Sequence, residues 1–480
     1  MKKYTSIYII NIGFILLLCA CSKSFLDQKP DYSQGVPSTL DDCQAMLDDY
    51  DRMNGNYSDH GEAAADNYYM SDGLYNSLQD VNNSPENKYN YIWHSLGEHV
   101  GEWLRSYQVV YSANLILNTL EKIPATNANY QSIKGGALFF RAFAFYHLAQ
   151  MFCKPYFPTT AASDPGIPLR LTPDLYEPSI RGTVKQVYER IIKDLEDAIL
   201  LLPEEVGIKS RPSKAAAYAM LARTYLTIQD YENARKMATE SLKLQNTLID
   251  YNLTSSTDLQ GTPTATTVTS HPTAASFIRF NAEVIFQAVT AYGTMEEYIV
   301  QIHPNLYNSY SSDDRRKTVF FKPDVDWMGR PTGIYRYRGN YDGSNSGRHS
   351  PFLFVGLATD EMYLIRAECY ARAGNITLAM ADLNTLMAKR MVPPYVNRIA
   401  TSVNDALVQI LAERRKELIF RTIRWTDLRR LNQDPQFAVT LHRDMNEIPY
   451  TPLQPNDLRY TFLIPTKEVI NVTGMEQNLR

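Results

Sequence analysis

The sequence predicts a mainly α-helical protein in which pairs of antiparallel helices are combined with an irregular, loop-rich half that carries a few short strands. Residues 221–241 and 367–386 place small and bulky residues at the offsets expected where two helices pack closely. Residues 102–123 carry apolar residues at helical spacings of three and four. Residues 307–350 show no helical period and mix aromatic residues with Gly, Asp, Asn and Arg. These observations predict a helical scaffold beside a separate, irregular region.

The N-terminal stretch has the features of a secretion signal. Two lysines precede the mostly apolar residues 7–18, which are too few to span a bilayer, since a span needs about 20 residues. The end of this run, Leu18-Cys19-Ala20-Cys21, resembles the lipobox of bacterial lipoproteins, which are cut before the Cys that carries the lipid. We therefore expect a signal peptide over 1–20, a lipid on Cys21 and a tether over 21–37. An ordinary cleaved signal with an incidental Cys21 is the alternative.

Composition limits what the body over 38–480 can be. Without the two signal lysines, 46 Lys and Arg residues face 52 Asp and Glu residues, a net charge of −6, which argues against nucleic-acid binding. Cys43, Cys153 and Cys369 are too few and too widely spaced for a disulfide framework or a metal site. The 33 tyrosines are unusual. A tyrosine joins a flat apolar face to a hydroxyl and suits polar ligands, although most of them are expected to pack inside.

Helices and loops alternate along the first part of the body. Residues 39–53 are expected to form a helix, and 54–90 have the Asn, Asp, Ser and Gly content of loops. The helix expected over 102–123 ends before Pro124.

Tetratricopeptide-like spacings follow. They occur at Leu221, Ala222, Tyr225, Tyr231, Ala234, Ala238 and Ser241, and again at Ala367, Tyr370, Gly374, Ile376, Ala379, Leu383 and Leu386. Ala142 and Phe145 start a further predicted unit, whose second helix lies near 184–201 after a Pro-rich insert. The two clear repeats are 145 residues apart, so another structure must be built into the gap. Within it, 254–273 is expected to be a loop, and 282–290 alternates like a strand.

The last long helix is predicted over 404–431 and is rich in charge. On one continuous helix, Leu411, Leu418, Trp425 and Leu428 share a face with Arg414 and Arg421, and Glu417 is placed to pair with Arg421. Two interpretations are open at this point. The arginines form an anion site, or a lattice of Glu and Arg side chains pins the helix to the core.

Together these pieces resemble the SusD/RagB family of outer-membrane nutrient-binding lipoproteins of Bacteroidetes-type bacteria. The resemblance covers nearly the whole chain. It is carried by Phe25-Leu26-Asp27, Trp103, Tyr107, Arg141-Ala142, Arg181, Arg211-Pro212-Ser213-Lys214, Glu361-Met362-Tyr363, Glu413-Arg414, Glu417-Leu418, Arg424-Trp425 and Asp427-Leu428. The chain departs from the family at Arg421-Thr422, where Glu-Gly is common, and at Leu479-Arg480, where Pro-Gly-Tyr is usual.

The resemblance implies a SusD-like fold of about four tetratricopeptide-like units, near 139–201, 214–243, 360–388 and 404–431, with ligand-face insertions near 54–100 and 254–350. It implies an outer-membrane location, lipid-anchored and facing the cell exterior, and a SusC-like TonB-dependent barrel as partner. The usual cargo is an oligosaccharide, and one branch handles peptides. Peptide capture by the same kind of complex and a tetratricopeptide protein-binding scaffold are therefore the alternatives.

No catalytic or cofactor motif appears, and we expect a binding protein rather than an enzyme, with no cofactor and no metal. Glu413 and Glu417 are candidates for paired glycosidase carboxylates, but the four basic residues around them would hold both ionised. A sugar has an apolar C–H face and a rim of hydroxyls, so it needs an aromatic platform beside polar side chains. Two stretches supply these. The predicted ligand-binding residues are Asp66, Tyr68, Tyr69, Asp72 and Trp93 in the first, and Trp327, Tyr337, Arg338, Asn340 and Tyr341 in the second.

Overall fold

The computed structural model describes residues 36–78, 86–94, 100–125, 128–252, 277–291, 300–326, 328–341 and 352–480. Cys21, Trp327 and the predicted loop over 254–273 lie outside the described residues. Within them the protein is mainly α-helical, as predicted, and its strands form small two-stranded sheets. None of the described helices is long and apolar enough to cross a membrane.

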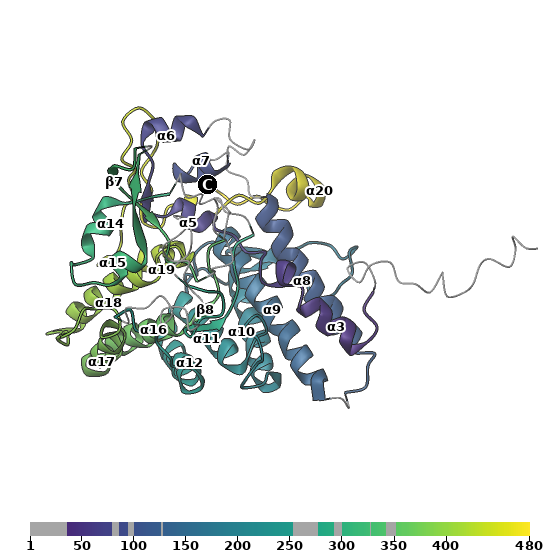
Figure 1. Ribbon diagram of the computed structural model, residues 1–480. Helices are drawn as coiled ribbons and strands as arrows, with labels where there is room; N and C mark the ends of the chain where they lie inside the picture. Colours follow the sequence, from purple (N-terminus) through teal and green to yellow (C-terminus); the bar gives the residue numbers. More distant parts are fainter. Residues whose placement is uncertain are drawn as a thin grey trace, which may run out of the picture.

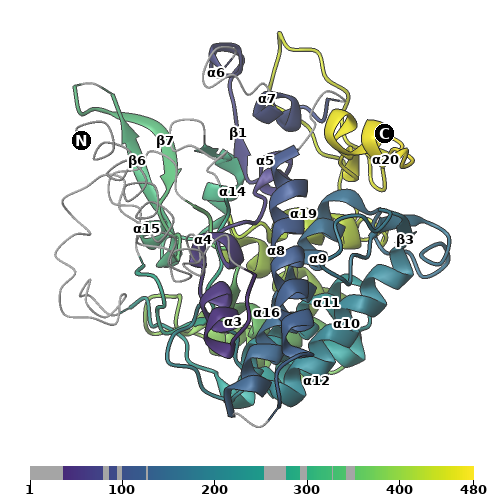
Figure 2. The same ribbon diagram turned by 90° about the vertical axis from the view of Figure 1, so that its right-hand side faces the viewer.

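Helix pairs build one side of the molecule (Figure 1). The pairs are α9 (Ala128–Phe152) with α10 (Val184–Leu201), α11 (Lys214–Thr227) with α12 (Tyr231–Leu244), and α16 (Thr359–Arg372) with α17 (Ile376–Met387). They are followed by α18 (Val403–Glu417), which packs on α16 and α17, and by α19 (Ile423–Leu431), which contacts α11. Before them, α8 (Val100–Leu120) lies beside α9 (Figure 2). Helix α12 packs directly on α16, so the insertion between them leaves the stack of helices continuous. The small residues predicted at the contacts, such as Ala222, Ala238 and Ala367, are fully buried.

Local capping explains where these helices begin. The side chains of Ser213, Asp230, Asn375 and Ser402 each accept a hydrogen bond from a backbone N–H in the first turn of α11, α12, α17 and α18, respectively. Thr183 and Gln186 form a reciprocal capping box at the start of α10. These residues satisfy N–H groups that have no partner within the helix itself.

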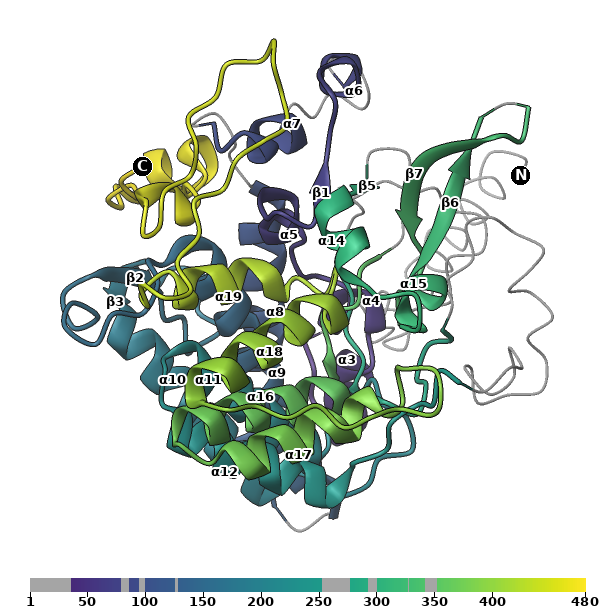
Figure 3. The same ribbon diagram turned by 90° about the vertical axis from the view of Figure 1, so that its left-hand side faces the viewer.

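The prediction of one continuous helix over 404–431 is wrong, because the helix is interrupted between Glu417, where α18 ends, and Ile423, where α19 begins. Phe420 and Thr422 adopt left-handed backbone conformations, with φ of 55° and 57°. The break turns α19 away from the axis of α18, so the face predicted for one continuous helix does not exist. Figure 3 shows α17, α16, α18 and α19 one above the other in the direction of α5 (His60–Ala64).

The charged side chains of this region form a buried lattice, which favours the structural interpretation over the anion site. Glu417 accepts from Arg316 at 3.0 Å and from Arg390 at 2.8 Å, so its predicted pairing with Arg421 is wrong. Arg421 instead donates to Asp360 at 2.9 Å. Three of the remaining pairs join elements far apart in sequence: Arg316 with Glu413, Arg390 with Glu283, and Arg430 with Glu368. Two others are closer along the chain: Arg316 with Asp314, and Arg414 with Asp427.

Thr422 stands where the resembled family commonly has Gly, and its φ of 57° gives the physical reason for that preference. A β-branched residue in this conformation costs about 1–2 kcal/mol, whereas Gly adopts it freely. We expect Thr422→Gly to raise the free energy of unfolding by about 0.5–1 kcal/mol. The gain is smaller than the relieved strain because Gly also increases the entropy of the unfolded chain. Urea unfolding measures this. Thr385→Gly, on the exposed face of α17, should lower the free energy of unfolding, because Gly is unfavourable inside a helix. A loss of stability in both variants would contradict the strain at Thr422.

The irregular half has more regular structure than the sequence suggested. The loop expected over 54–90 contains α5, β1 (Tyr68–Tyr69), α6 (Asp72–Ser77) and α7 (Glu86–Tyr91). The region predicted to lack regular structure contains α14 (Pro304–Ser309), α15 (Arg316–Val319) and a hairpin of β6 (Phe321–Val325) and β7 (Pro331–Tyr337). These elements are too short for a visible period, and the hairpin is interrupted by a bulge between Pro323 and Val325.

One further strand pair connects this half to the scaffold, and another joins two insertions within it. Strand β4 (Val284–Phe286), within the segment predicted to alternate, pairs antiparallel with β8 (Leu357–Ala358), which leads into α16. Strand β1 pairs antiparallel with β5 (Gln301–Ile302), and β5 packs against β7. The insertions near 54–94 and 300–341 therefore lie side by side.

Candidate functional site

The first predicted group of ligand residues is largely occupied by internal contacts. Tyr68 is buried and its hydroxyl donates to the carbonyl oxygen of Ala63 at 2.8 Å. Asp66 receives two hydrogen bonds from Arg424, at 2.7 and 2.9 Å. Although burial raises the pKa of Asp66, Arg424 and Arg415 hold it well below its usual range. Asp72 accepts from two backbone N–H groups near Asn446. These contacts give structural roles to all three residues: Tyr68 bonds within the irregular half, Asp66 links it to Arg424 of α19, and Asp72 links it to the segment at Asn446.

The second predicted group is also mostly internal. Tyr341 and Asn340 are buried. The hydroxyl of Tyr341 donates to Glu283, and the amide of Asn340 bonds the backbone of Phe352 and Phe354. Arg338 donates to the carbonyl oxygen of Thr318. Tyr337 is half-buried with its ring 4.8 Å from that of Phe420.

The two predicted stretches nevertheless meet at one surface through the contacts of β1, β5 and β7. Tyr69 on β1 is half-exposed and its ring centroid lies 6.3 Å from that of His303. Tyr307 and Tyr335, both half-exposed, stack with centroids 3.6 Å apart and planes 15° apart. Sequence reasoning singled out Tyr69 but gave no role to His303. The structure places these aromatic rings around the same strands.

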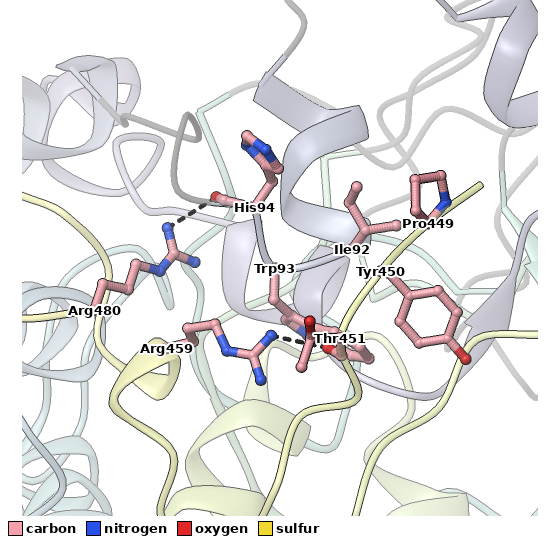
Figure 4. Close-up of a pocket in the computed structure, with 8 residues that line it drawn as sticks. All are labelled: Ile92, Trp93, His94, Pro449, Tyr450, Thr451, Arg459 and Arg480. Atoms are coloured by element: carbon pink, nitrogen blue, oxygen red, sulfur yellow. Dashed lines mark hydrogen bonds between the residues drawn. The ribbon is translucent and has the colours of Figure 1, made fainter.

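A pocket of about 400 Å³ opens beside Trp93, and we call it the Trp93 pocket (Figure 4). It is lined by Ile92, Trp93, His94, Pro449, Tyr450, Thr451, Arg459 and Arg480. Of these, only Trp93 belongs to the predicted ligand residues. The pocket therefore joins the end of α7 to two C-terminal segments that lie more than 350 residues away along the chain.

Trp93 forms the floor of this pocket. Its backbone is left-handed, with φ of 57°, and its Nε1 donates to the carbonyl oxygen of Ala64 at 2.9 Å. Only 2% of its surface is exposed, so Trp93 is a fixed floor and not a free stacking platform. Arg443 packs with its guanidinium 4.3 Å from the ring centroid and donates to the carbonyl oxygens of Ala64 and Ala65.

The walls of the Trp93 pocket combine apolar and polar groups. Tyr450 is half-buried, and its hydroxyl is fixed by the backbone N–H and carbonyl of Arg443, at 3.0 and 2.8 Å. Pro449 and Thr451 are exposed on the same segment. Such a mixture of apolar faces and hydrogen-bonding groups suits a ligand that has both, and the volume falls within the range of small-ligand sites.

The carboxylates deep in the protein are tied to arginines. Burial raises the pKa of Glu413, but Arg316, Lys416 and Arg398 lower it to about 2, so this side chain is ionised and cannot act as a proton donor at neutral pH. The carboxylates of Glu283, Asp360 and Glu417 approach one another closely enough to hold a metal ion. Each of them is already paired with a buried arginine of the lattice, which supplies the positive charge a metal would bring.

The fold and the pocket define a class of helical-repeat proteins with an inserted loop-rich half, and comparisons with known proteins identify the family. Residues 24–226 match a family described as "Starch-binding associating with outer membrane", and residues 278–480 match the SusD family. The two matches together span both halves of the chain. The protein therefore belongs to the SusD/RagB family, as the sequence motifs indicated.

Individual relatives agree with this assignment. The chain is 27% identical to SusD-like protein P2 of Formosa agariphila over 378 residues, which are 68% of this chain and 71% of that protein. A SusD superfamily protein from Bacteroides vulgatus has the same fold, with a TM-score of 0.71, 21% identity and coverage of 92% of this chain and 99% of that one. A laminarin-binding SusD-like protein matches with a TM-score of 0.62 at 17% identity, covering 91% of this chain and 97% of that one.

Proposed function

We propose that this protein is a surface lipoprotein that binds an oligosaccharide and delivers it to a SusC-like TonB-dependent barrel for uptake. The Trp93 pocket is the observation that carries the binding part of this proposal. Beside the fixed floor of Trp93 it joins an aromatic and apolar wall at Tyr450 and Pro449 to a hydrogen-bonding group at Thr451, and a sugar ring requires both kinds of surface. The family description and the laminarin-binding neighbour support a glycan as the ligand class.

The transport part of the proposal rests on the family and on the N-terminal motif. A lipid on Cys21 would attach the body to the outer membrane, and the tether would leave it free to cap the barrel. Affinity purification of the tagged protein from detergent-solubilised outer membranes tests this directly. We expect a TonB-dependent barrel to co-purify in a stoichiometric amount. Its absence under gentle extraction would leave a free-standing binding protein and remove the transport role.

Filling the Trp93 pocket should strongly weaken glycan binding without unfolding the protein. Thr451 is exposed at the rim, so Thr451→Trp should add a bulky ring to the pocket without overpacking the core. We expect the affinity for the best-binding oligosaccharide to fall about tenfold or more, which corresponds to at least ~1.4 kcal/mol. Isothermal titration calorimetry measures the loss.

Leu200→Trp is the matched control for this experiment, because Leu200 is 81% exposed on α10 and lies outside the pocket. It should leave both affinity and melting temperature unchanged. If Thr451→Trp binds the glycan as tightly as the control does, the ligand occupies another surface, and the rings around Tyr69 and Tyr335 become the next region to alter.

A further inference from the structure

The two arginines of the Trp93 pocket differ in how their charges are compensated. Arg459 donates from Nε and Nη2 to the carboxylate of Asp457, at 3.0 and 2.8 Å. It also donates to the backbone carbonyl oxygens of Thr451 and Pro452. The charge of Arg459 is therefore matched within the protein, and its hydrogen bonds hold residues 451–452 close to residues 457–459.

Arg480 has no comparable partner in the part of the chain that the structure describes. Its Nη1 donates to the carbonyl oxygen of His94 at 3.2 Å, and its guanidinium lies 5.5 Å from the ring centroid of Phe462. Its Nε is buried and makes no hydrogen bond with any described residue. Asp457 acts on it electrostatically, but that carboxylate is already bound by Arg459.

The surroundings of Arg480 favour an additional negative charge. Burial, with a further contribution from Arg459, lowers the pKa of Arg480 to about 10, which means that its charged form is less well solvated than in water. A bound anion would restore this lost stabilisation. Charge-assisted hydrogen bonds between guanidinium and carboxylate or sulfate oxygens are among the stronger polar contacts, and a planar guanidinium matches the geometry of such groups.

The pocket also separates its charged side from its apolar side. In Figure 4, Arg480 and Arg459 lie on one side, Pro449 and Tyr450 lie on the other, and Trp93 lies between them. A sugar ring that bears an acidic substituent has the same two-sided character. Its C–H face would contact Tyr450 and Pro449, and its anionic group would reach Arg480.

We infer that the ligand of the Trp93 pocket is an acidic oligosaccharide, whose carboxylate or sulfate group is bound by Arg480. This inference rests on the proposed function, because it specifies the substrate class of the same site. It predicts that discrimination between charged and uncharged glycans depends on Arg480, whereas Tyr450 and Pro449 contribute to the binding of either kind.

The test begins with an array of carboxylated, sulfated and neutral oligosaccharides built on several backbones. The strongest acidic ligand is then compared by calorimetry with its uncharged counterpart of the same length, made by carboxyl reduction or desulfation. We expect the acidic form to bind the wild-type protein about tenfold or more tightly than the neutral form. Arg480→Gln should remove this preference, and Arg480→Lys, which keeps the charge, should retain a large part of it. Rising NaCl concentration should weaken only the charge-dependent part.

The outcomes separate this inference from the proposed function. Equal or tighter binding of neutral glycans would overturn the acidic substrate class and leave glycan binding intact. A preference for acidic glycans that survives in Arg480→Gln would overturn the role of Arg480. Binding of no glycan in the array would contradict the proposed function itself. Whether carboxylated or sulfated ligands bind more tightly identifies the anionic group.

Discussion

Arg316→Met is expected to lower the free energy of unfolding by about 3–5 kcal/mol, the largest effect among the substitutions considered. Arg316 is fully buried and is surrounded by three carboxylates. It donates to Asp314 from Nε and Nη2, at 2.9 and 2.6 Å, and also to Glu413 and Glu417. Met has a similar length but no charge, so the substitution would leave buried negative charges undercompensated. Urea unfolding followed by circular dichroism measures the loss.

Arg330→Met is the matched control for this prediction. The side chain of Arg330 is 66% exposed and pairs with Asp326 at the hairpin turn, where an ion pair contributes only about 0–1 kcal/mol. Arg316→Lys should fall between the two, since it keeps the charge but cannot bond three carboxylates at once. Equal losses in Arg316→Met and Arg330→Met would show that the lattice does not stabilise the fold.

The second large effect is a change in how stability depends on pH. Glu62 is fully buried, and burial raises its pKa from 4.5 to about 7, although Asn67 donates to Oε1 at 2.6 Å. As pH rises from 4.5 towards 7, the unfolded chain releases this proton while the folded protein keeps it, so stability falls. Glu62→Gln cannot titrate and retains the acceptor for Asn67. We expect the variant to gain roughly 3 kcal/mol relative to wild type between about pH 4.5 and pH 8.

The measurement is a series of urea unfolding curves of both proteins across this pH range. Glu283, whose pKa burial also raises to about 7, is present in both and cancels in the difference. Glu189→Gln is the control, since Glu189 is exposed on α10. A difference between Glu62→Gln and wild type that stays constant with pH would show that Glu62 is already ionised inside the folded protein.

Local sequence patterns were sufficient to predict the helical scaffold. Ala222, Ala238 and Ala367 recur at set offsets because helix–helix contact depends on residues three and four apart, and these are neighbours in any helix. The family motifs lie on the same helices, which is why fold and family could both be recognised. The prediction of a continuous helix over 404–431 was wrong for a local reason. The helical spacing of its apolar residues does not reveal that Thr422 takes the left-handed conformation in which Gly is favoured.

The sequence could not predict which buried charges pair with one another. Arg316 and Glu417 are 101 residues apart, and Arg421 and Asp360 are 61 apart, so their contacts exist only once the helices have packed. From spacing alone, Glu417 and Arg421 were expected to pair. Glu417 and Arg421 pair with other residues because a buried charge must be compensated by groups that are close in the folded protein, and these need not be close in sequence.

The candidate site shows most clearly which features the local sequence predicts and which depend on tertiary packing. The sequence by itself determined that aromatic and polar residues cluster near 66–93 and 335–341, and it singled out Trp93, which lines the pocket. Only the tertiary structure decided that Tyr68 and Tyr341 turn inward and that Tyr450 and Arg480 come to Trp93. Helices follow from contacts a few residues apart, whereas this pocket is built by loops from opposite ends of the chain, whose conformations depend on packing against everything between them.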